Sequence, residues 1–194
     1  MREETDPPAF DPPTPLRVRR LRPADSVGAL TLLIHRAYAP LLEKGLHFVA
    51  ATQDEATTRS RIAEGECFVA EVDGRIVGTI LLRPPTASTR CAYYARAGVA
   101  SIHQLAVEPA LQRRGIARRL VEAAEERARE IGAEEVALDT AESASHLLAR
   151  YERWGYRVVD AVDWRPEVNY RSVVMAKTLS PGMRRSTDPE RAGA

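Results

Sequence analysis

A strand, a long helix and a second strand follow one another in the middle of the chain, and this order constrains the fold more than any other feature. Residues 99–107 read as a strand that ends before Pro109. Residues 115–131 read as an amphipathic helix, and its apolar side chains recur at helical spacing at Leu120, Ala124, Ala128 and Ile131. The short apolar run at 136–138 is typical of a buried strand. Two strands joined by a helix pair in parallel, so we expect a β-α-β crossover here.

The remaining elements favour antiparallel pairing around that crossover. Residues 67–72 and 75–82 flank Asp73 and Gly74, a two-residue turn that predicts a hairpin. Further strands are predicted at 16–21, 156–162 and 169–179, and further helices at 24–38, 52–64 and 144–154. The predicted fold class is therefore α/β (α+β), a mixed and mostly antiparallel sheet of about seven strands with helices on both faces.

The two ends of the chain differ in composition from its centre. Five prolines lie within residues 1–15, among acidic and small residues, and predict a disordered arm. Residues 180–194 predict a flexible polar tail. A length of 194 residues suits one domain, which we place at 16–179.

Charge and composition exclude several classes of function. A formal net charge of +1 disfavours a protein that binds nucleic acid or a membrane surface through bulk charge. No apolar run reaches the roughly 18 residues of a membrane span, and the N-terminus has no signal-peptide pattern, so a cytoplasmic location is expected. Two cysteines and four scattered histidines offer no metal-ligand spacing, so no metal is expected.

The start of the long helix is the best candidate for an anion-binding site. Gly115 would let the backbone approach an anion closely, and the first turn of a helix offers free N–H groups. Arg113, Arg114 and Arg118 add positive charge at a helix end where it opposes the macrodipole. A solvated arginine-rich turn is the alternative, but an anionic ligand would recover the electrostatic cost. The glycine patterns of the P-loop and of dinucleotide-binding folds are absent from the sequence.

Two motifs together resemble those of the GNAT acyltransferase superfamily. Residues 112–117 read Gln-Arg-Arg-Gly-Ile-Ala, after Leu-Ala-Val-Glu-Pro at 105–109, and are similar to the family's coenzyme A signature. Residues 149–156 read Ala-Arg-Tyr-Glu-Arg-Trp-Gly-Tyr and resemble the family's Leu-Tyr-x-x-x-Gly-Phe segment. The order of predicted elements extends this resemblance over 16–179.

The resemblance implies a single GNAT domain that uses acetyl-CoA as acyl-donor substrate and needs no metal. Acetyl-CoA would lie in a splayed β-α-β split and pair with the backbone of the first strand. An amine would then attack the thioester directly. The implied cofactor-binding residues are Leu105, Ala106, Val107, Gln112, Arg113, Arg114, Gly115, Ile116, Ala117, Arg118 and Ser143, where Ser143 takes the place of a frequent asparagine of the family.

His103 is the candidate general base. Strand alternation predicts that Ser101, His103, Leu105 and Val107 share one face. The segment 103–107 also resembles that of the serotonin N-acetyltransferases, in which histidines at the positions of Ser101 and His103 relay protons. A structural histidine with water as the base is the alternative, and Glu108 is a second candidate.

Tyr151 is the candidate general acid. The resemblance places this tyrosine beside the coenzyme sulfur, where its phenol would protonate the departing thiolate. The alternative is a packing role on the helix face that it shares with Leu147, Leu148 and Trp154.

The acceptor is predicted to be a small-molecule amine, because a loop at 84–98 with Tyr93 and Tyr94 would enclose a small ligand. A protein or peptide acceptor, or a non-catalytic acyl-CoA-binding regulatory module, are the alternatives. A homodimer is possible. Weaker candidates for the acceptor side are Tyr38, His47, Phe48, Arg96, Asp160, Asp163 and Trp164.

Overall fold

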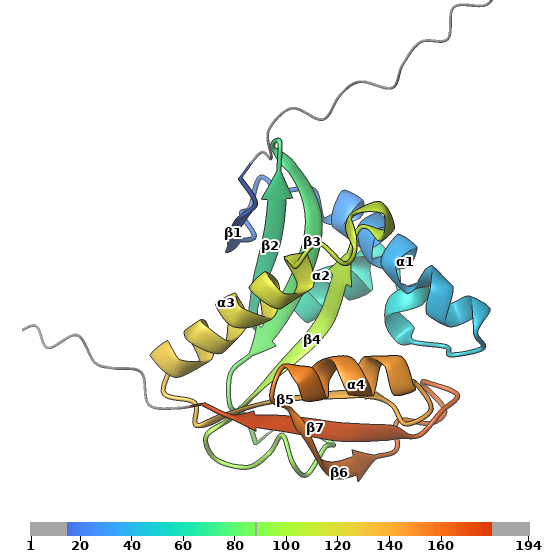
Figure 1. The fold of residues 1–194 in the computed structure, drawn as a ribbon, viewed down its shortest axis with the longest axis vertical. Helices are drawn as coiled ribbons and strands as arrows, with labels where there is room; N and C mark the ends of the chain where they lie inside the picture. Colours follow the sequence, from blue (N-terminus) through green and yellow to red (C-terminus); the bar gives the residue numbers. More distant parts are fainter. Residues whose placement is uncertain (1–14, 88, 180–194) are drawn as a thin grey trace, which may run out of the picture.

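One mixed sheet organises the part of the chain that the computed structural model describes, residues 15–87 and 89–179 (Figure 1). The predictions for residues 1–14 and 180–194 lie outside these described residues. The sheet has seven strands in the order β1-β2-β3-β4-β5-β7-β6, and only β4 and β5 pair in parallel. Their bounds are β1 Arg17–Arg20, β2 Glu66–Val72, β3 Arg75–Arg83, β4 Val99–Val107, β5 Glu135–Ala141, β6 Arg157–Val162 and β7 Ser172–Thr178. The predicted mixed, mostly antiparallel sheet is confirmed.

Four α-helices accompany the sheet in the described residues: α1 Val27–Glu43, α2 Glu55–Ala63, α3 Ile116–Glu130 and α4 Ser145–Arg153. Side-chain caps fix where α1 and α2 begin, because the Ser26 side chain accepts a hydrogen bond from the Ala29 N–H and the Asp54 side chain accepts one from the Thr57 N–H. The helix α1 therefore begins three residues later than the sequence suggested. None of these helices combines the length and hydropathy needed to span a membrane.

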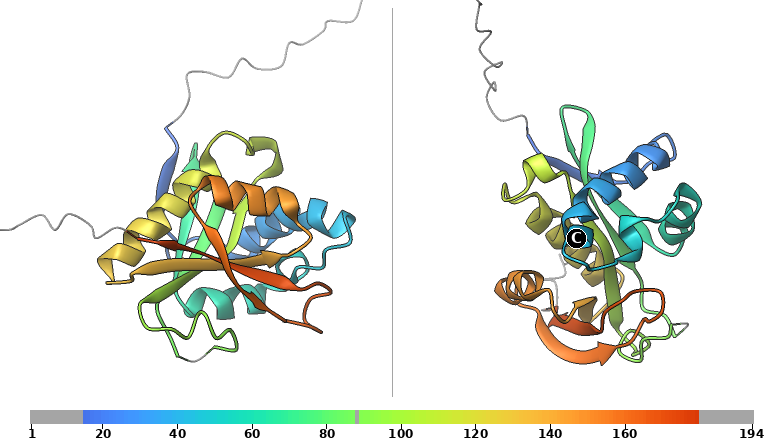
Figure 2. Two further views of the ribbon diagram at one scale, coloured as in Figure 1. Left: turned by 60° about the horizontal axis from the view of Figure 1, so that its bottom comes forward. Right: turned by 90° about the vertical axis from the view of Figure 1, so that its right-hand side faces the viewer.

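Helices cover both faces of the sheet, as predicted (Figure 2). On one face, the apolar stripe of α3 buries Leu120, Val121 and Ala124 against the central strands, and α4 packs against the same core. On the other face, Leu30, Leu33 and Ile34 of α1 form a second core with β2 and β3. This burial provides the main driving force for holding α1, α3 and the sheet together.

The parallel pair β4–β5 separates soon after it forms. Backbone pairing is limited to three positions, Val99 with Glu135, Ala100 with Val136, and Ser101 with Ala137. Beyond them β4 stays paired with β3, and β5 stays paired with β7 (Figure 1). The sheet is thus split between residues 102–107 and 138–141, as the expected splayed crossover requires.

A β-bulge in β4 corrects one sequence prediction. Thr79 pairs with Ala106 and Leu81 pairs with His103, so β4 holds one extra residue, and Gln104 has φ of 52°. The bulge reverses the alternation of side chains. The expectation that Ser101, His103, Leu105 and Val107 share one face is therefore wrong: the first two face the α1 and α2 side, and the last two pack toward the α3 core.

Candidate active site

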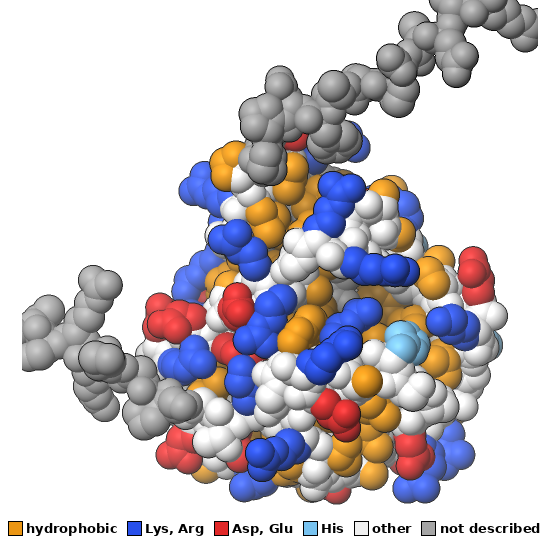
Figure 3. Space-filling view, viewed as in Figure 1, with side chains coloured by type: hydrophobic (Ala, Val, Ile, Leu, Met, Phe, Trp, Pro, Cys, Tyr) orange, Lys and Arg blue, Asp and Glu red, His pale blue; other side chains and the backbone are white. Residues whose placement is uncertain are grey.

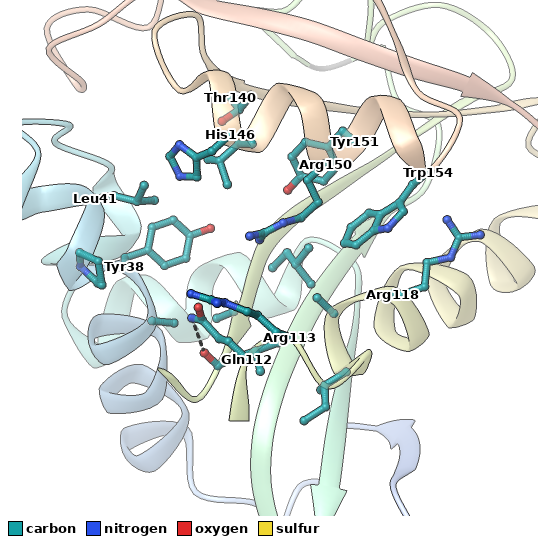
Figure 4. A pocket seen from close by; sticks show the side chains of 18 of the residues that line it. Tyr38, Leu41, Gln112, Arg113, Arg118, Thr140, His146, Arg150, Tyr151 and Trp154 are labelled. Atoms are coloured by element: carbon teal, nitrogen blue, oxygen red, sulfur yellow. Dashed lines mark hydrogen bonds between the residues drawn. The ribbon is translucent and has the colours of Figure 1, made fainter. Parts of the chain in front are cut away.

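A cavity of about 870 Å³ occupies the split between β4 and β5 (Figure 4). The end of β4 and the first turn of α3 form one wall, and α4 and the second half of α1 form the others. Nine of the predicted cofactor residues line it: Leu105, Ala106, Val107, Gln112, Arg113, Gly115, Ile116, Ala117 and Arg118. One segment of the chain therefore supplies a continuous wall.

The start of α3 presents free N–H groups to this cavity. The first backbone hydrogen bond at the helix start runs from the Arg119 N–H to the Gly115 carbonyl, at 3.1 Å. The N–H groups that precede it in the first turn therefore have no partner within the helix. Gly115 adopts φ of 81°, and a Cβ built there meets no atom within 4 Å. Gln112 closes the loop by donating to the Val107 carbonyl at 3.2 Å. With no acidic residue in the first turn, this helix end is suited to an anion.

Positive side chains surround the same cavity. Figure 3 shows Lys and Arg side chains around a hollow with an apolar floor, and Figure 4 shows Arg113 and Arg150 extending into the space between α1 and α4. The cationic and imidazole side chains that line the cavity are Lys44, Arg113, Arg118, His146, Arg150 and Arg153, and Asp139 is the acidic residue among the lining residues. The cavity is therefore suited to a ligand with several negative charges.

Sequence reasoning missed part of this wall and included two residues that do not line it. Lys44, Arg150 and Arg153 come from the ends of α1 and α4, and only the arginines in the last turn of α4 gave a local signal. Arg114 and Ser143 are exposed and lie outside the lining residues. Thr140 lines the cavity instead, and its buried Oγ1 has no hydrogen-bond partner among the described residues.

A second cavity, of about 370 Å³, adjoins the first on the far side of the split. The two cavities share five lining residues, Tyr38, Phe48, Leu105, Asp139 and Tyr151. The second cavity extends from this shared wall toward the end of α2, the end of β3 and the loop before β4. Two ligands can therefore meet at the wall that the cavities have in common.

His103 lies in the second cavity and is largely enclosed. Its Nε2 atom is 2.8 Å from the Ser101 hydroxyl, and its ring contacts Tyr94 edge-on at 5.7 Å. Burial, together with the positive charges of Arg83 and Arg61, lowers the pKa of His103 from 6.5 to about 3. The imidazole is therefore neutral at pH 7 and can accept a hydrogen bond, but it holds a proton weakly.

Tyr151 lies on the shared wall, as the general-acid prediction requires. Its ring packs edge-on against Trp154 at 5.7 Å and Tyr156 at 6.0 Å. Burial raises the pKa of Tyr151 to about 12, so the phenol stays protonated at pH 7 and can donate. Figure 4 shows Tyr38 of α1 facing Tyr151 of α4 across the cavity, with both hydroxyls directed inward.

Asp139 is the functional candidate that sequence reasoning missed. Its carboxylate accepts hydrogen bonds from the Tyr94 hydroxyl at 2.8 Å and the Trp164 Nε1 at 2.9 Å. Burial raises its pKa despite these bonds. The signal was its place directly after the buried run 136–138, because ligands of open α/β sheets gather at the carboxyl ends of parallel strands.

The weaker candidates separate once the side chains are placed. Tyr94, Phe48 and Trp164 line the second cavity, whereas Tyr93 donates to Glu135 at 2.8 Å and anchors the loop. Glu108 is paired with Arg36 and lines neither cavity. Across the described residues, no cluster of three or more His, Cys, Asp or Glu side chains could hold a metal.

Comparisons with known proteins agree with this geometry. The model of the acetyltransferase (GNAT) family matches residues 33–156. S-(2-succino)cysteine N-acetyltransferase from Bacillus subtilis (strain 168) is 36% identical over 137 residues, which cover 70% of this chain and 79% of that protein.

Solved structures share the fold at low sequence identity. The ribosomal-protein-S18-alanine N-acetyltransferase from Escherichia coli has a TM-score of 0.66 at 18% identity, covering 88% of this chain and 97% of that one. A GNAT family acetyltransferase from Elizabethkingia anophelis with acetyl-CoA bound has a TM-score of 0.58 at 14% identity, covering 84% of this chain and 98% of that one.

Proposed function

The chain belongs to the GNAT family of acetyltransferases, and on that premise we propose that it transfers the acetyl group of acetyl-CoA directly to a primary amine of a small molecule. The observation that carries the proposal is the pair of adjoining cavities, one suited to a polyanion and one of small-molecule size. They meet at Leu105, Asp139 and Tyr151, so a thioester and an amine can be held in contact there.

The larger cavity has the features that acetyl-CoA needs as a substrate. The first turn of α3 and the arginines around it would bind the pyrophosphate. The edge of β4 at 105–107 has separated from β5 and is available to pair with the amides of the pantetheine arm. The buried Oγ1 of Thr140 offers one further polar contact. These groups would bind acetyl-CoA and orient its thioester.

The bulge in β4 has a direct consequence for the reaction. Gln104 has a left-handed backbone, and the next residue, Leu105, lines the cavity. A backbone N–H at this point would donate to the thioester carbonyl, where negative charge develops during attack. The Gln104 side chain fixes the bulge by donating to Gln53 Oε1 at 2.7 Å.

Proton transfer would involve the two candidates from the sequence. Tyr151, protonated at pH 7, would donate to the departing thiolate. His103, neutral at pH 7, would accept the proton of the amine, through Ser101 or a water molecule. The low pKa of His103 leaves water as the competing base.

A small acceptor is supported by the size of the second cavity and by one relative. A volume of about 370 Å³ lies at the lower end of the range for small-molecule pockets. The relative at 36% identity is named for a cysteine derivative, S-(2-succino)cysteine. That compound is therefore the first acceptor to test.

Thiol release from acetyl-CoA tests the proposal against panels of amines, aminoglycosides, amino acids and peptides. We expect release with at least one small amine. Release with peptides alone would make this a protein acetyltransferase. Tight binding of acetyl-CoA without release for any acceptor would identify a regulatory module that binds acyl-CoA without turnover.

A further inference from the structure

Arginine side chains gather at the end of the second cavity that lies away from the shared wall. Arg61 of α2, Arg83 of β3 and Arg90 of the following loop line this cavity, and none of them lines the first. Arg90 is paired with Glu167 at 2.8 Å and stacks over Trp164, and Arg83 is paired with Glu64. Glu64 and Glu167 thus pair with two of these three guanidinium groups, and the third has no ion-pair partner among the described residues.

The third guanidinium group is that of Arg61, and the nearby carboxylates of Glu64 and Asp139 act on it only at longer range. Within residues 15–87 and 89–179, Arg61 forms no ion pair and no side-chain hydrogen bond. Its side chain is half-buried, and burial together with the nearby charge of Arg83 lowers its pKa. Holding two guanidinium groups close together in a partly desolvated place costs free energy, which an anionic ligand would offset.

Arg83 also retains unused hydrogen-bonding capacity. The carboxylate of Glu64 pairs with its Nη2 atom, while its buried Nε atom has no partner among the described residues. A planar guanidinium with free donors matches the geometry of a carboxylate. Arg61 and Arg83 therefore offer free guanidinium donors to the same cavity.

The cavity has opposite charge at its two ends. Asp139 lies on the shared wall, where the proposed reaction would place the attacking amine, and a carboxylate there would attract an ammonium group. Arg61 and Arg83 lie at the other end. A ligand that fits both ends carries an amine and a carboxylate in one small molecule.

We propose that Arg61 and Arg83 bind a carboxylate of the acceptor, so that the acceptor is an amino acid whose amine is directed to Asp139 and Tyr151. The inference rests on the proposed function, because it names the substrate class of the same site. One guanidinium group without an ion pair, beside one unpartnered Nε atom, fits a singly charged carboxylate better than a doubly charged phosphate. It also disfavours cationic acceptors such as polyamines and aminoglycosides, which Arg61 and Arg83 would repel.

Matched acceptors test the proposal on the wild-type enzyme. The panel pairs each L-amino acid with its α-amide, and S-carboxymethylcysteine with S-carbamoylmethylcysteine, so that size is kept while one charge is removed. Among the amines that are acetylated, we expect kcat/KM to fall roughly tenfold or more when the bound carboxylate becomes an amide. Equal rates for acids and amides, or turnover restricted to amines without a carboxylate, would overturn the inference. If no amine of any kind reacts, the proposed function fails instead.

Variants assign the effect to the two arginines. Arg61→Gln and Arg83→Gln should each raise KM for a carboxylated acceptor about tenfold and reduce the preference over its amide, with KM for acetyl-CoA unchanged. Arg59→Gln is the matched control, because Arg59 lies on the same helix, is exposed, pairs with Glu55 and lines neither cavity. If Arg61→Gln and Arg83→Gln lower the rates of acid and amide equally, the arginines are structural and the proposal is wrong.

Discussion

The two cavities that meet at Leu105, Asp139 and Tyr151 are built in different ways. Backbone groups and one short segment, residues 105–118, make most of the anion-binding wall of the larger cavity. Residues from α1, α2, α4, β3, β4, β5 and three connecting segments make the smaller one. A site made from backbone at a helix start tolerates few local sequences, whereas a site made from distant side chains is free to vary.

Because the larger cavity relies on backbone groups of one segment, a single substitution there should abolish acetyl-CoA binding. Gly115→Glu would place a carboxylate at the mouth of the α3 cradle, where it competes with a pyrophosphate for the same N–H groups. We expect acetyl-CoA binding to become undetectable in calorimetric titration, while the circular dichroism spectrum stays that of a folded protein.

Gly115→Gln is the matched control for this variant. It imposes the same backbone strain at φ of 81° and nearly the same volume, but it adds no charge. Binding should be weakened less by Gln than by Glu. A folded Gly115→Glu protein with the wild-type dissociation constant would remove the first turn of α3 from the site.

The same difference explains what the sequence could predict. The crossover and the hairpin at Asp73-Gly74 are encoded by local periodicity and turn residues, and both are found in the structure; nine of the residues predicted to bind the cofactor line one cavity. The bulge at Gln104 has no such local signature, because its partner Gln53 lies about fifty residues away. The predicted alternation of side chains along β4 is therefore wrong beyond the bulge.

The charged residues of the second cavity could not be predicted from the sequence for the same reason. Asp139, Arg61 and Arg83 come from three separate elements, and only the fold brings them to one cavity. In the sequence, Arg61 reads as one arginine of an exposed polar helix. Nothing in the sequence distinguishes Tyr93 from Tyr94. In the structure, the Tyr93 hydroxyl donates to Glu135 and the Tyr94 hydroxyl donates to Asp139.

A substitution in the shared wall should reduce the rate of acetylation more than the affinity for acetyl-CoA. Tyr151→Phe removes one hydroxyl and keeps the ring contacts with Trp154 and Tyr156. If this phenol protonates the thiolate, single-turnover acetylation should slow by roughly 10²-fold, with little change in acetyl-CoA affinity. Acetylation at the wild-type rate in single-turnover experiments would reduce Tyr151 to a packing residue.

The titration of His103 offers a further prediction, with a smaller expected effect than the Tyr151→Phe substitution. Because its folded pKa is lowered to about 3, the ring should stay neutral as pH falls through 6.5, where an exposed histidine would gain a proton. If His103 is the base, the acidic limb of kcat/KM that it causes lies below 6.5, and the amine adds its own limb at higher pH. The ring C–H signals in NMR report this directly, with His103→Gln to identify the resonance.

Charge in the second cavity should shift the pKa of His103 in a defined direction. Arg83→Gln removes a positive charge that opposes protonation, so the pKa of His103 should rise. A carboxylate bound at Arg61 and Arg83 should act in the same direction. A ring that titrates near 6.5 in the wild-type protein and is insensitive to Arg83→Gln would show that His103 is solvated.

In the proposed reaction, both substrates occupy the joined cavities at once and the acetyl group passes directly between them. Initial velocities measured over a matrix of acetyl-CoA and acceptor concentrations test it most directly. Direct transfer predicts intersecting lines in double-reciprocal plots, and no acetylated protein in mass spectra after incubation with acetyl-CoA alone. Parallel lines together with a stable acetylated form of the enzyme would show an acyl-enzyme route and contradict the account.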